Sequence, residues 1–156
     1  MEFTIRVATL DDLPAICALS QELFEYEKQF TDEFAMDWSL SENGKSFFTK
    51  RIRGRSSFIL LAEMENKVIG YAVIFIERQM FRAYNRIAEL ENLCVAPKNR
   101  GQGVGSALIV AAKEKSRQMG AKRLKVFMLS QNEKAIHFYR TQGFFDFDLV
   151  MEIKLE

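Results

Sequence analysis

Three glycines within five residues give this chain a segment that could hold an anion on its backbone. Arg100 is followed by Gly101-Gln102-Gly103-Val104-Gly105-Ser106, between an apolar strand-like run and a helix-like run. Glycine lacks the Cβ atom that keeps a ligand away from the main chain, so successive N–H groups can turn toward one anion. The helix that begins there adds its unpaired first-turn N–H groups and about half a unit of positive charge. The sequence therefore predicts a diphosphate site at residues 100–106.

Spacing separates this loop from two common phosphate-binding loops. The dinucleotide pattern G-x-G-x-x-G/A fails in both frames, because Ser106 and Leu108 occupy its last position. The nucleotide P-loop ends in Gly-Lys-Ser/Thr, which is not found here. What remains is Arg-x-x-Gly-x-Gly after Val95-Ala96-Pro97, which resembles the acetyl-CoA motif of the GNAT superfamily of N-acetyltransferases.

A second motif, near the C-terminus, strengthens that resemblance. The motif reads Asn132-x-x-Ala135-x-x-x-Tyr139-x-x-x-Gly143-Phe144 and resembles the closing segment of GNAT enzymes. Its residues follow one another at steps of three and four, so they lie along one face of a helix. The resemblance implies that Tyr139 is the acid that protonates the departing CoA thiolate, and that Asn132 either contacts the cofactor arm or orients the acceptor side. From spacing alone, Tyr139 could equally be an aromatic residue of the core.

Two carboxylates precede the glycine loop on an expected strand over 86–95. Acetyl transfer to an amine requires a neutral nitrogen, and a carboxylate can remove the extra proton directly or through a water molecule. Glu89 and Glu91 point to the same side of a regular strand. The Glu-x-Leu-x-Val pattern resembles the position of the general base in many GNAT enzymes, which favours Glu91, with Glu89 as the second candidate. A solvated strand edge is the alternative for both.

The same strand contains a conflict that a β-bulge would resolve. A regular strand would place Leu93 and Val95 on the face of the two glutamates, so we expect a bulge between Asn92 and Val95. Such a bulge exposes main-chain groups of Leu93, Cys94 and Val95. By resemblance to the family, these groups pair with the pantetheine arm of acetyl-CoA, and a donor near Leu93 stabilises the oxyanion of acyl transfer.

The segment 22–42 is acidic and aromatic, with seven carboxylates against Lys28. In GNAT relatives the region between the first two helices borders the acceptor groove. The resemblance therefore implies an acceptor site formed by Glu22, Tyr26, Trp38 and Glu91. We expect a primary amine there, either a small cationic amine of the polyamine kind or an amine of a peptide or protein. A solvated acidic face above packed aromatic residues is the alternative.

Length, net charge and cysteine content limit the kinds of protein that this chain could be. A length of 156 residues is typical of one domain, which we expect to span residues 1–156. A formal net charge of +1 gives no global field that would recruit nucleic acid or a membrane surface. Cys17 and Cys94 lie in apolar segments without metal-ligand spacing, so we expect no metal and a cytoplasmic protein. The apolar runs are far shorter than the roughly 20 residues of a membrane span.

Periodicity and turn residues predict the elements that position these groups. A first helix follows a capping box, Thr9-x-x-Asp12, and further helices are expected over 41–53, 103–119 and 132–141. Strands are expected over 4–7, 57–63, 68–77, 86–95 and 122–129, with a final strand region over 144–154. The strands over 57–63 and 68–77 are joined tightly through Glu65-Asn66-Lys67, which predicts an antiparallel hairpin. This order predicts an α/β fold with a mixed, largely antiparallel sheet of six to seven strands and helices on both faces. The GNAT resemblance implies the same single-domain fold.

The function that these features predict is an acetyl-CoA-dependent N-acetyltransferase, with direct transfer to a primary amine. Two other classes remain open: a non-catalytic acyl-CoA-binding sensor or partner module, and a nucleic-acid-binding domain built on the basic residues near 50–55 and 78–86. The near-neutral charge argues against nucleic acid as a partner. A homodimer also remains open.

Overall fold

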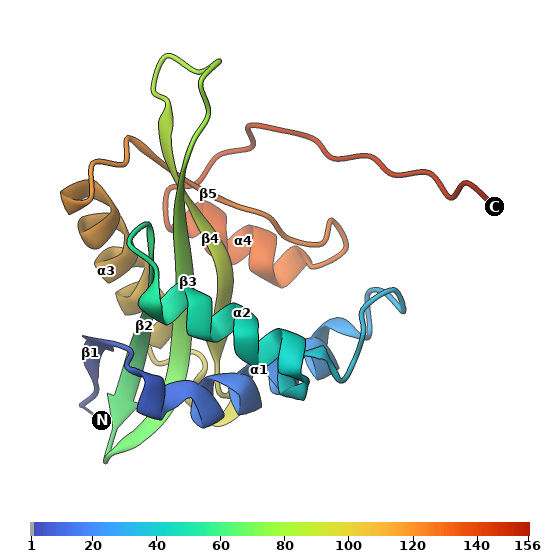
Figure 1. Cartoon of the computed structure of the whole chain (residues 1–156). Helices are drawn as coiled ribbons and strands as arrows, with labels where there is room; N and C mark the ends of the chain where they lie inside the picture. Colours follow the sequence, from blue (N-terminus) through green and yellow to red (C-terminus); the bar gives the residue numbers. More distant parts are fainter. Residues whose placement is uncertain (1) are drawn as a thin grey trace.

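A five-stranded sheet and four α-helices form the fold of residues 2–156, which the structure, a computed structural model, describes (Figure 1). The strands, in spatial as well as chain order, are β1 Thr4–Val7, β2 Ser57–Met64, β3 Lys67–Arg78, β4 Arg86–Val95 and β5 Arg123–Val126. The helices are α1 Leu13–Glu27, α2 Glu42–Arg53, α3 Val104–Gln118 and α4 Glu133–Thr141. Three short 3-10 turns are η1 Leu10–Asp12, η2 Trp38–Leu40 and η3 Pro97–Asn99.

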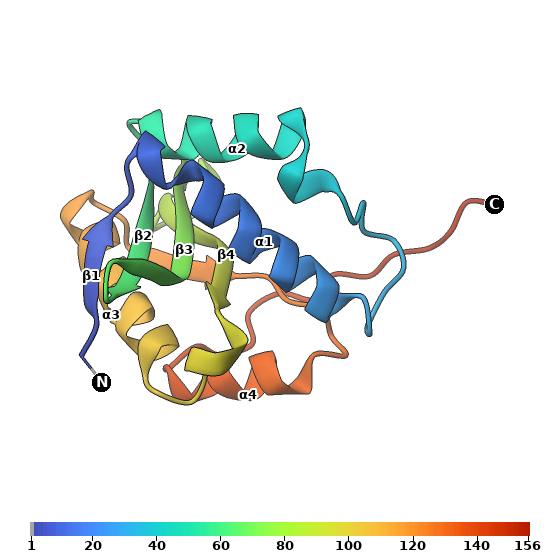
Figure 2. The ribbon, with the colours of Figure 1, turned by 90° about the horizontal axis from the view of Figure 1, so that it is seen from below.

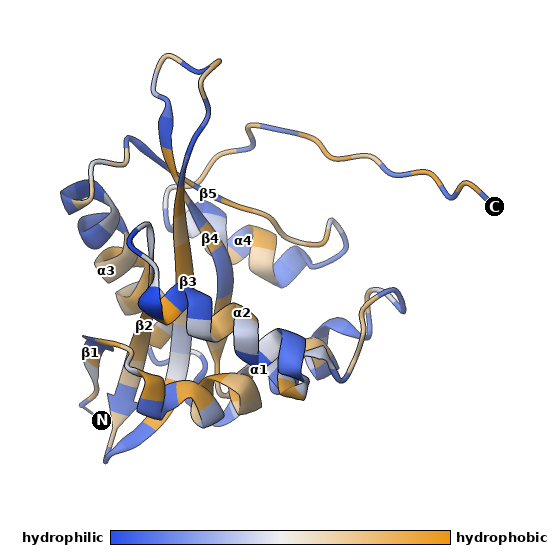
Figure 3. Cartoon of the chain, viewed as in Figure 1, coloured by the Kyte–Doolittle hydropathy of each residue, from blue (hydrophilic) through white to orange (hydrophobic). Residues whose placement is uncertain are grey.

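The helices cover both faces of the sheet (Figure 2). Helices α1 and α2 pack on one face, in a core that contains Ile16 and Phe48, whereas α3 contributes Leu108 to the core of the other face. Along β2, Phe58 faces the α3 core and Ile59 faces the α1 and α2 core, so the strand is buried on both sides. In Figure 3 the central part of the sheet is coloured mainly hydrophobic, whereas the helices carry both hydrophilic and hydrophobic residues along their length. None of the helices within residues 2–156 is long and apolar enough to cross a membrane.

The topology confirms the mixed sheet. Neighbouring strands from β1 to β4 pair antiparallel, and α3 carries the chain across to β5, which pairs parallel with β4. The tight turn between β2 and β3 contains Glu65 and Asn66, with φ values of 50° and 60°. A two-residue hairpin turn of this kind requires positive φ at both positions, which asparagine tolerates better than most residues. The predicted hairpin is therefore present.

The predicted number of strands is wrong, and so is the final strand over 144–154. Residues 145–156 form neither strand nor helix, and they run away from the body of the protein as an extended segment (Figure 1). An alternating sequence becomes a strand only when a neighbouring edge pairs with its N–H and C=O groups, and this segment has no such neighbour. The sheet therefore ends at β5, whose outer edge carries no partner strand among the described residues.

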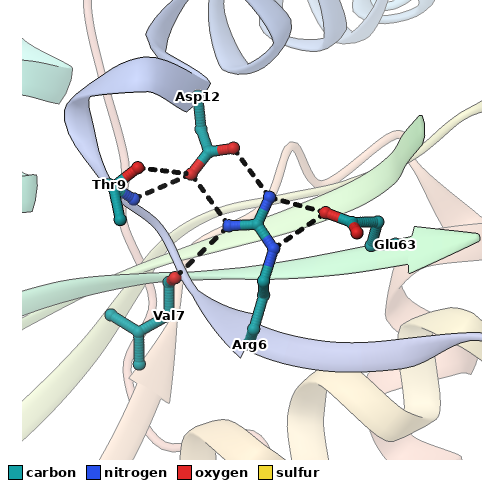
Figure 4. Close-up of polar contacts among 5 residues, drawn as sticks. All are labelled: Arg6, Val7, Thr9, Asp12 and Glu63. Carbon is teal, nitrogen blue, oxygen red and sulfur yellow. Dashed lines mark hydrogen bonds and ion pairs between the residues drawn. The ribbon is translucent and has the colours of Figure 1, made fainter. Parts of the chain in front are cut away.

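A partly buried ion-pair network ties the edge strand β1 to β2 and to the start of α1 (Figure 4). Arg6 on β1 donates from Nη2 to Asp12 Oδ1 at 2.8 Å and from Nε to Glu63 Oε2 at 2.8 Å. The Asp12 carboxylate also accepts the Thr9 N–H at 2.8 Å, as the capping box predicts. The hydrogen bonds from Arg6 are the main reason that the pKa of Asp12 is lowered to about 2, and burial opposes them. One guanidinium thus joins three segments of the chain.

We expect Asp12→Ala to lower the free energy of unfolding by about 1–2 kcal/mol at pH 7, because it removes a cap and an ion pair. A carboxyl group with a lowered folded-state pKa contributes stability above its unfolded value, near 3.8, and loses it as pH falls through about 2. The difference between wild type and variant in urea unfolding should therefore shrink between pH 4 and pH 2. Asp11→Ala, at an exposed neighbouring carboxylate, is the matched control. A difference that stays constant with pH would contradict the assignment.

Candidate functional site

The site begins where β4 and β5 separate. The two strands pair only from Ile87 to Leu90 on β4, opposite Arg123 to Val126 on β5. The rest of β4, from Glu91 to Val95, is paired with β3 on one side and has no strand on the other. Main-chain groups on that open side are consequently free to bind a ligand.

Hydrogen-bond alternation in the antiparallel pair decides which groups face the opening. The Ala96 N–H donates to the Ile69 carbonyl at 2.8 Å, and in this register Cys94 likewise exchanges its bonds with β3. The N–H and C=O groups of Leu93 and Val95 therefore point toward β5. The Val95 carbonyl already accepts from Arg100 Nε at 2.9 Å, which leaves both groups of Leu93 and the Val95 N–H open.

Cys94, the third cofactor-binding residue that the sequence predicts on this strand, differs from its neighbours. Its main chain pairs with β3, and its thiol is buried, where Sγ donates to the Leu19 carbonyl at 3.3 Å. Burial raises the pKa of the thiol to about 12. The structure thus places Cys94 in the α1 and α2 core, with no group directed into the opening.

The bulge that the sequence predicts is present, but its position was predicted wrongly. Val73 lies opposite Asn92 and Ile74 lies opposite Leu90, so Glu91 is the extra residue of β4. The extra residue reverses the side-chain alternation. For this reason Leu90 before it and Leu93 after it both pack against the α3 core.

Glu91 forms a bidentate ion pair with Arg51 of α2. Arg51 Nε lies 2.6 Å from Glu91 Oε2, and Arg51 Nη2 lies 2.7 Å from Oε1. The guanidinium also lies over the rings of Phe47 and Phe75, at 4.8 and 4.5 Å from their centroids. A carboxylate offers about four acceptor positions, so two remain for a water or an ammonium group. The charge of Glu91 is thus held in one place at the bulge.

Glu89 lies on the same face of the sheet, opposite Phe75, but has a different partner. Lys125 Nζ lies 3.2 Å from Glu89 Oε2 and 2.6 Å from Glu77 Oε1. The hydrogen bond from Lys125 is the main cause of the lowered pKa of Glu77, with burial opposing it. The two candidate bases are therefore held by separate cations.

The glycine loop presents an uninterrupted run of free amides. The N–H groups of residues 101–106 donate no hydrogen bond to any other group in the described chain; the next amide, that of Ala107, bonds the Gly103 carbonyl at 3.0 Å. Gly101 and Gly103 have φ values of 73° and 81°, a conformation that disfavours any residue with a Cβ atom. Val104 begins α3, so the positive end of its dipole adds to these six amides. An anion fits this cradle.

Gly105, the third glycine of the loop, is needed for helix packing and not for its backbone conformation. A Cβ atom on Gly105 would lie 3.2 Å from Cζ of Phe138, so the missing side chain lets α3 approach α4. Gln142 Nε2 donates to Ser106 Oγ at 3.1 Å and joins the same two helices. On the other side of the loop, the guanidinium of Arg100 lies 5.1 Å from the centroid of the Tyr26 ring, at the end of α1.

Helix α4 places the two residues of the second motif differently. Asn132 is the N-cap, and its Oδ1 accepts the Ala135 N–H at 3.1 Å. Its amide nitrogen donates to no other group of residues 2–156. Tyr139 is buried between the rings of Phe138 and Phe144, and its hydroxyl has no hydrogen-bond partner in the described chain. Burial, and to a lesser extent the charge of Glu27, raise the pKa of Tyr139 above its ordinary value.

Two hollows flank the segment between α1 and α2. The first has a volume of about 340 Å³ and is lined by Phe24, Glu33, Phe34, Ala35, Trp38 and Asn92. The second, of about 240 Å³, lies between the end of α1 and the start of α4 and includes Tyr26 and Asn132. Of the four predicted acceptor residues, Trp38 thus borders the first hollow and Tyr26 the second, whereas neither exposed Glu22 nor Glu91 lines either hollow.

Sequence reasoning missed the residues that hold the bulge. Tyr71 is fully buried, and its hydroxyl lies 3.1 Å from Asn92 Oδ1, while Asn92 Nδ2 donates to the Glu91 carbonyl at 2.7 Å. Arg51 stands in a basic run that resembles ordinary surface charge. Its contact with Glu91 spans 40 residues, and no spacing in the sequence signals it. Within residues 2–156, no cluster of acidic, histidine or cysteine side chains could hold a metal ion.

Known proteins resemble this chain over most of its length. An uncharacterized N-acetyltransferase of Bacillus subtilis, YhfO, is 30% identical over 90% of this chain and 88% of its own length. A thialysine N-epsilon-acetyltransferase of Bos taurus is 30% identical over 89% of this chain and 82% of its own length.

Similarity in three dimensions extends to more distant proteins. The aminoglycoside N-acetyltransferase AAC(6')-Iy, solved in complex with CoA, superposes with a TM-score of 0.78 over 98% of this chain and 94% of its own. At 17% identity this likeness shows the fold alone. Residues 13–144 match the sequence model of the acetyltransferase (GNAT) family. The chain therefore belongs to the GNAT family, and it is an N-acetyltransferase that uses acetyl-CoA as its acetyl donor.

Proposed function

We propose that this enzyme transfers acetyl directly from acetyl-CoA to a small cationic primary amine, with Glu91 as general base and Tyr139 as general acid. The observation that carries the proposal is the run of six free amides at residues 101–106 beside the unpaired stretch of β4. A sheet normally pairs such groups, so their combined freedom supports a ligand that is both anionic and extended.

Acetyl-CoA matches both the free amides of the glycine loop and the unpaired stretch of β4. Acetyl-CoA supplies a thioester on an amide-containing arm that ends in a diphosphate. The amides of residues 101–106 would hold the diphosphate, and the free main-chain groups of Leu93 and Val95 would pair with the arm. A main-chain N–H on this strand would also donate to the thioester oxygen as negative charge develops there.

Glu91 would remove the proton of the acceptor ammonium, directly or through a water held on its free acceptor positions. Arg51 fixes the orientation of this carboxylate, and the Asn92 side chain fixes the bulge that presents it. Glu89 is the second candidate for the base. Asn92, the residue after Glu91, lines the first hollow, whereas Glu89 pairs with Lys125 on β5, and for this reason we place Glu91 ahead of Glu89.

Tyr139 would protonate the departing thiolate. Because its pKa is raised, the hydroxyl carries its proton throughout the neutral range. A CoA thiol titrates near 8.5, so the thiolate leaves with little assistance and a weak acid is sufficient. This argues that the contribution of Tyr139 is smaller than that of the base.

The first hollow, beside Asn92, is our candidate for the acceptor site. Three aromatic rings would cover an apolar stem, and Glu33 would attract an ammonium group. Glu33 already lies 3.6 Å from the ammonium of Lys154. The bovine relative, by its name, acetylates the ε-amino group of thialysine, which is a side-chain amine of this kind.

A non-catalytic acyl-CoA sensor is the second candidate function. It would use the same cradle and would release no CoA when amines are added. Turnover of acetyl-CoA with any amine excludes it.

The acceptor is tested by a screen that measures free CoA with polyamines, lysine-like amines, amino sugars, antibiotics and peptides. We expect cationic alkylamines to give the largest kcat/KM, and Glu33→Gln to raise their KM about two- to fivefold, because exposed charge pairs contribute up to about 1 kcal/mol. Glu25→Gln, an exposed carboxylate of α1 outside the first hollow, is the control and should change KM little. Higher activity with anionic amino sugars or acidic peptides would refute the cationic acceptor.

For the chemical step, we expect Glu91→Gln to lower kcat by about 10²- to 10⁴-fold, and Tyr139→Phe to lower it by less. The measurement is single-turnover kinetics at saturating donor and acceptor, with Tm recorded because Glu91→Gln also breaks the pair with Arg51. Tyr84→Phe, on the exposed tip of the β3–β4 hairpin, is the control for the tyrosine. If Glu89→Gln slows the step more than Glu91→Gln does, the base is Glu89. If neither Glu91→Gln nor Tyr139→Phe slows the step, both roles are wrong.

For the cradle, Gly103→Ala should weaken CoA binding about tenfold, or about 1.4 kcal/mol, because a Cβ atom at positive φ displaces the amides. Gly143→Ala is a matched control: its φ is 88°, and like Gly103 it has no atom within 4 Å of an added Cβ. Calorimetry with CoA should show normal affinity for that control. Equal losses in both variants would mean that only general stability was affected.

A further inference from the structure

Lys154 differs from the other lysines of residues 2–156 because its ammonium group pairs with a residue of the first hollow. Its Nζ lies 3.6 Å from Oε1 of Glu33, which lines that hollow together with Asn92. Lys45 and Lys125, the two other lysines with ion pairs in the described chain, bind carboxylates that do not line it. A primary amine of the chain itself therefore lies beside the hollow that we propose for the acceptor.

The segment that carries Lys154 is held loosely. Residues 145–156 form neither helix nor strand and extend away from the body (Figure 1). Near its start, Asp146 pairs with Arg140, and Arg82 lies over the Phe147 ring. Residues 148–153 make no hydrogen bond or ion pair with any other part of residues 2–156, and from 147 to 154 the chain can span up to about 25 Å. The Lys154 side chain can thus move into the hollow without unfolding a helix or strand.

The first hollow suits a lysine side chain and borders the strand proposed to hold the donor. Its three aromatic rings match a four-carbon apolar stem, and Glu33 matches the ammonium at the end of that stem. Asn92 in its wall stands between Glu91, the proposed base, and Leu93, whose free main-chain groups would pair with the arm of acetyl-CoA. An amine in this hollow is therefore next to both the base and the donor strand.

We propose that the enzyme acetylates its own Lys154, which enters the first hollow as an internal acceptor. The proposal rests on the reaction and the acceptor site proposed above. The base takes one proton from the ammonium group, and the neutral Nζ then attacks the carbonyl carbon of the thioester. A C–N bond forms and the C–S bond breaks. The second proton lost by the nitrogen ends on the sulfur, so the products are acetyl-Lys154, CoA and one released proton.

The weakness of the contact with Glu33 suits an internal acceptor. The side chains of Lys154 and Glu33 are 82% and 58% exposed, and exposed pairs of this kind contribute little free energy. Lys154 therefore does not block the hollow against external amines. Acetylation removes the positive charge of the side chain, so the product is no longer attracted to Glu33.

Peptide mapping by mass spectrometry tests the site, after incubation of the whole chain with acetyl-CoA and no added amine. We expect Lys154 to be acetylated at least about tenfold faster than any other lysine, because the tether holds its amine near the site at millimolar effective concentration. Lys134, an exposed residue of α4 that lines the second hollow, is the matched control. Lys154→Arg should abolish the fast modification, Lys134→Arg should retain it, and neither should change turnover of an external amine.

Rates then distinguish catalysed self-acetylation from other origins of the modification. The first-order rate constant should not change with protein concentration, because the amine and the site belong to one chain. A saturating cationic amine should slow the modification, and the chain unfolded in urea should react more slowly than the folded chain. Equal rates at Lys154 and Lys134, equal rates in the folded and unfolded chain, no effect of the amine, or a rate that rises with protein concentration would each overturn the proposal.

Turnover of an external amine, measured on the same protein, separates this proposal from the proposed reaction. If external amines are acetylated and Lys154 stays unmodified, self-acetylation is wrong and the reaction stands. If neither an external amine nor Lys154 is acetylated, both are wrong.

Discussion

Main-chain hydrogen bonding of β4 is the constraint on which the rest of the site depends. A buried strand must pair its N–H and C=O groups, and β4 does so with β3 along its length but with β5 only as far as Leu90. The main-chain groups of residues 91–95 that face away from β3 have no partner strand, so only a group from outside the sheet can pair with them. An extended, amide-containing ligand is such a partner, and the helix that follows the strand begins with six more unpaired amides. In the donor site that we propose, the arm of acetyl-CoA would take the place of the missing strand beside this part of β4.

The bulge solves a second problem on the same strand. One extra residue at Glu91 lets apolar side chains reach the α3 core on both sides of it while a carboxylate turns toward α2. The extra residue of a bulge is left out of the cross-strand pairing. Here the Tyr71 hydroxyl, from the buried interior, and the Asn92 amide hold the main chain in place. The position of the Glu91 carboxylate therefore depends on a hydrogen bond from the core as much as on its ion pair with Arg51.

Local patterns in the sequence were sufficient for much of this structure. The glycine spacing, the β2–β3 turn and the capping box at Thr9 depend on contacts within a few residues, and each lies where the pattern predicts. Contacts that join distant segments were not predictable: Arg51 meets Glu91 across 40 residues, and the bulge lies upstream of its expected position because cross-strand packing sets it. The final strand failed for a different reason. Its alternation is real, but alternation alone does not supply a pairing partner, and residues 145–156 pair with no strand among residues 2–156.

The stacking of Arg100 on Tyr26 has an energetic consequence for the two substrates. Arg100 belongs to the glycine loop that we propose as the donor site and also bonds the Val95 carbonyl, while Tyr26, which the sequence predicts at the acceptor site, lines the second hollow. Any rearrangement of this contact on binding one substrate changes the work needed to bind the other. Thermodynamic linkage makes that influence equal in both directions, so each substrate alters the dissociation constant of its partner by the same factor.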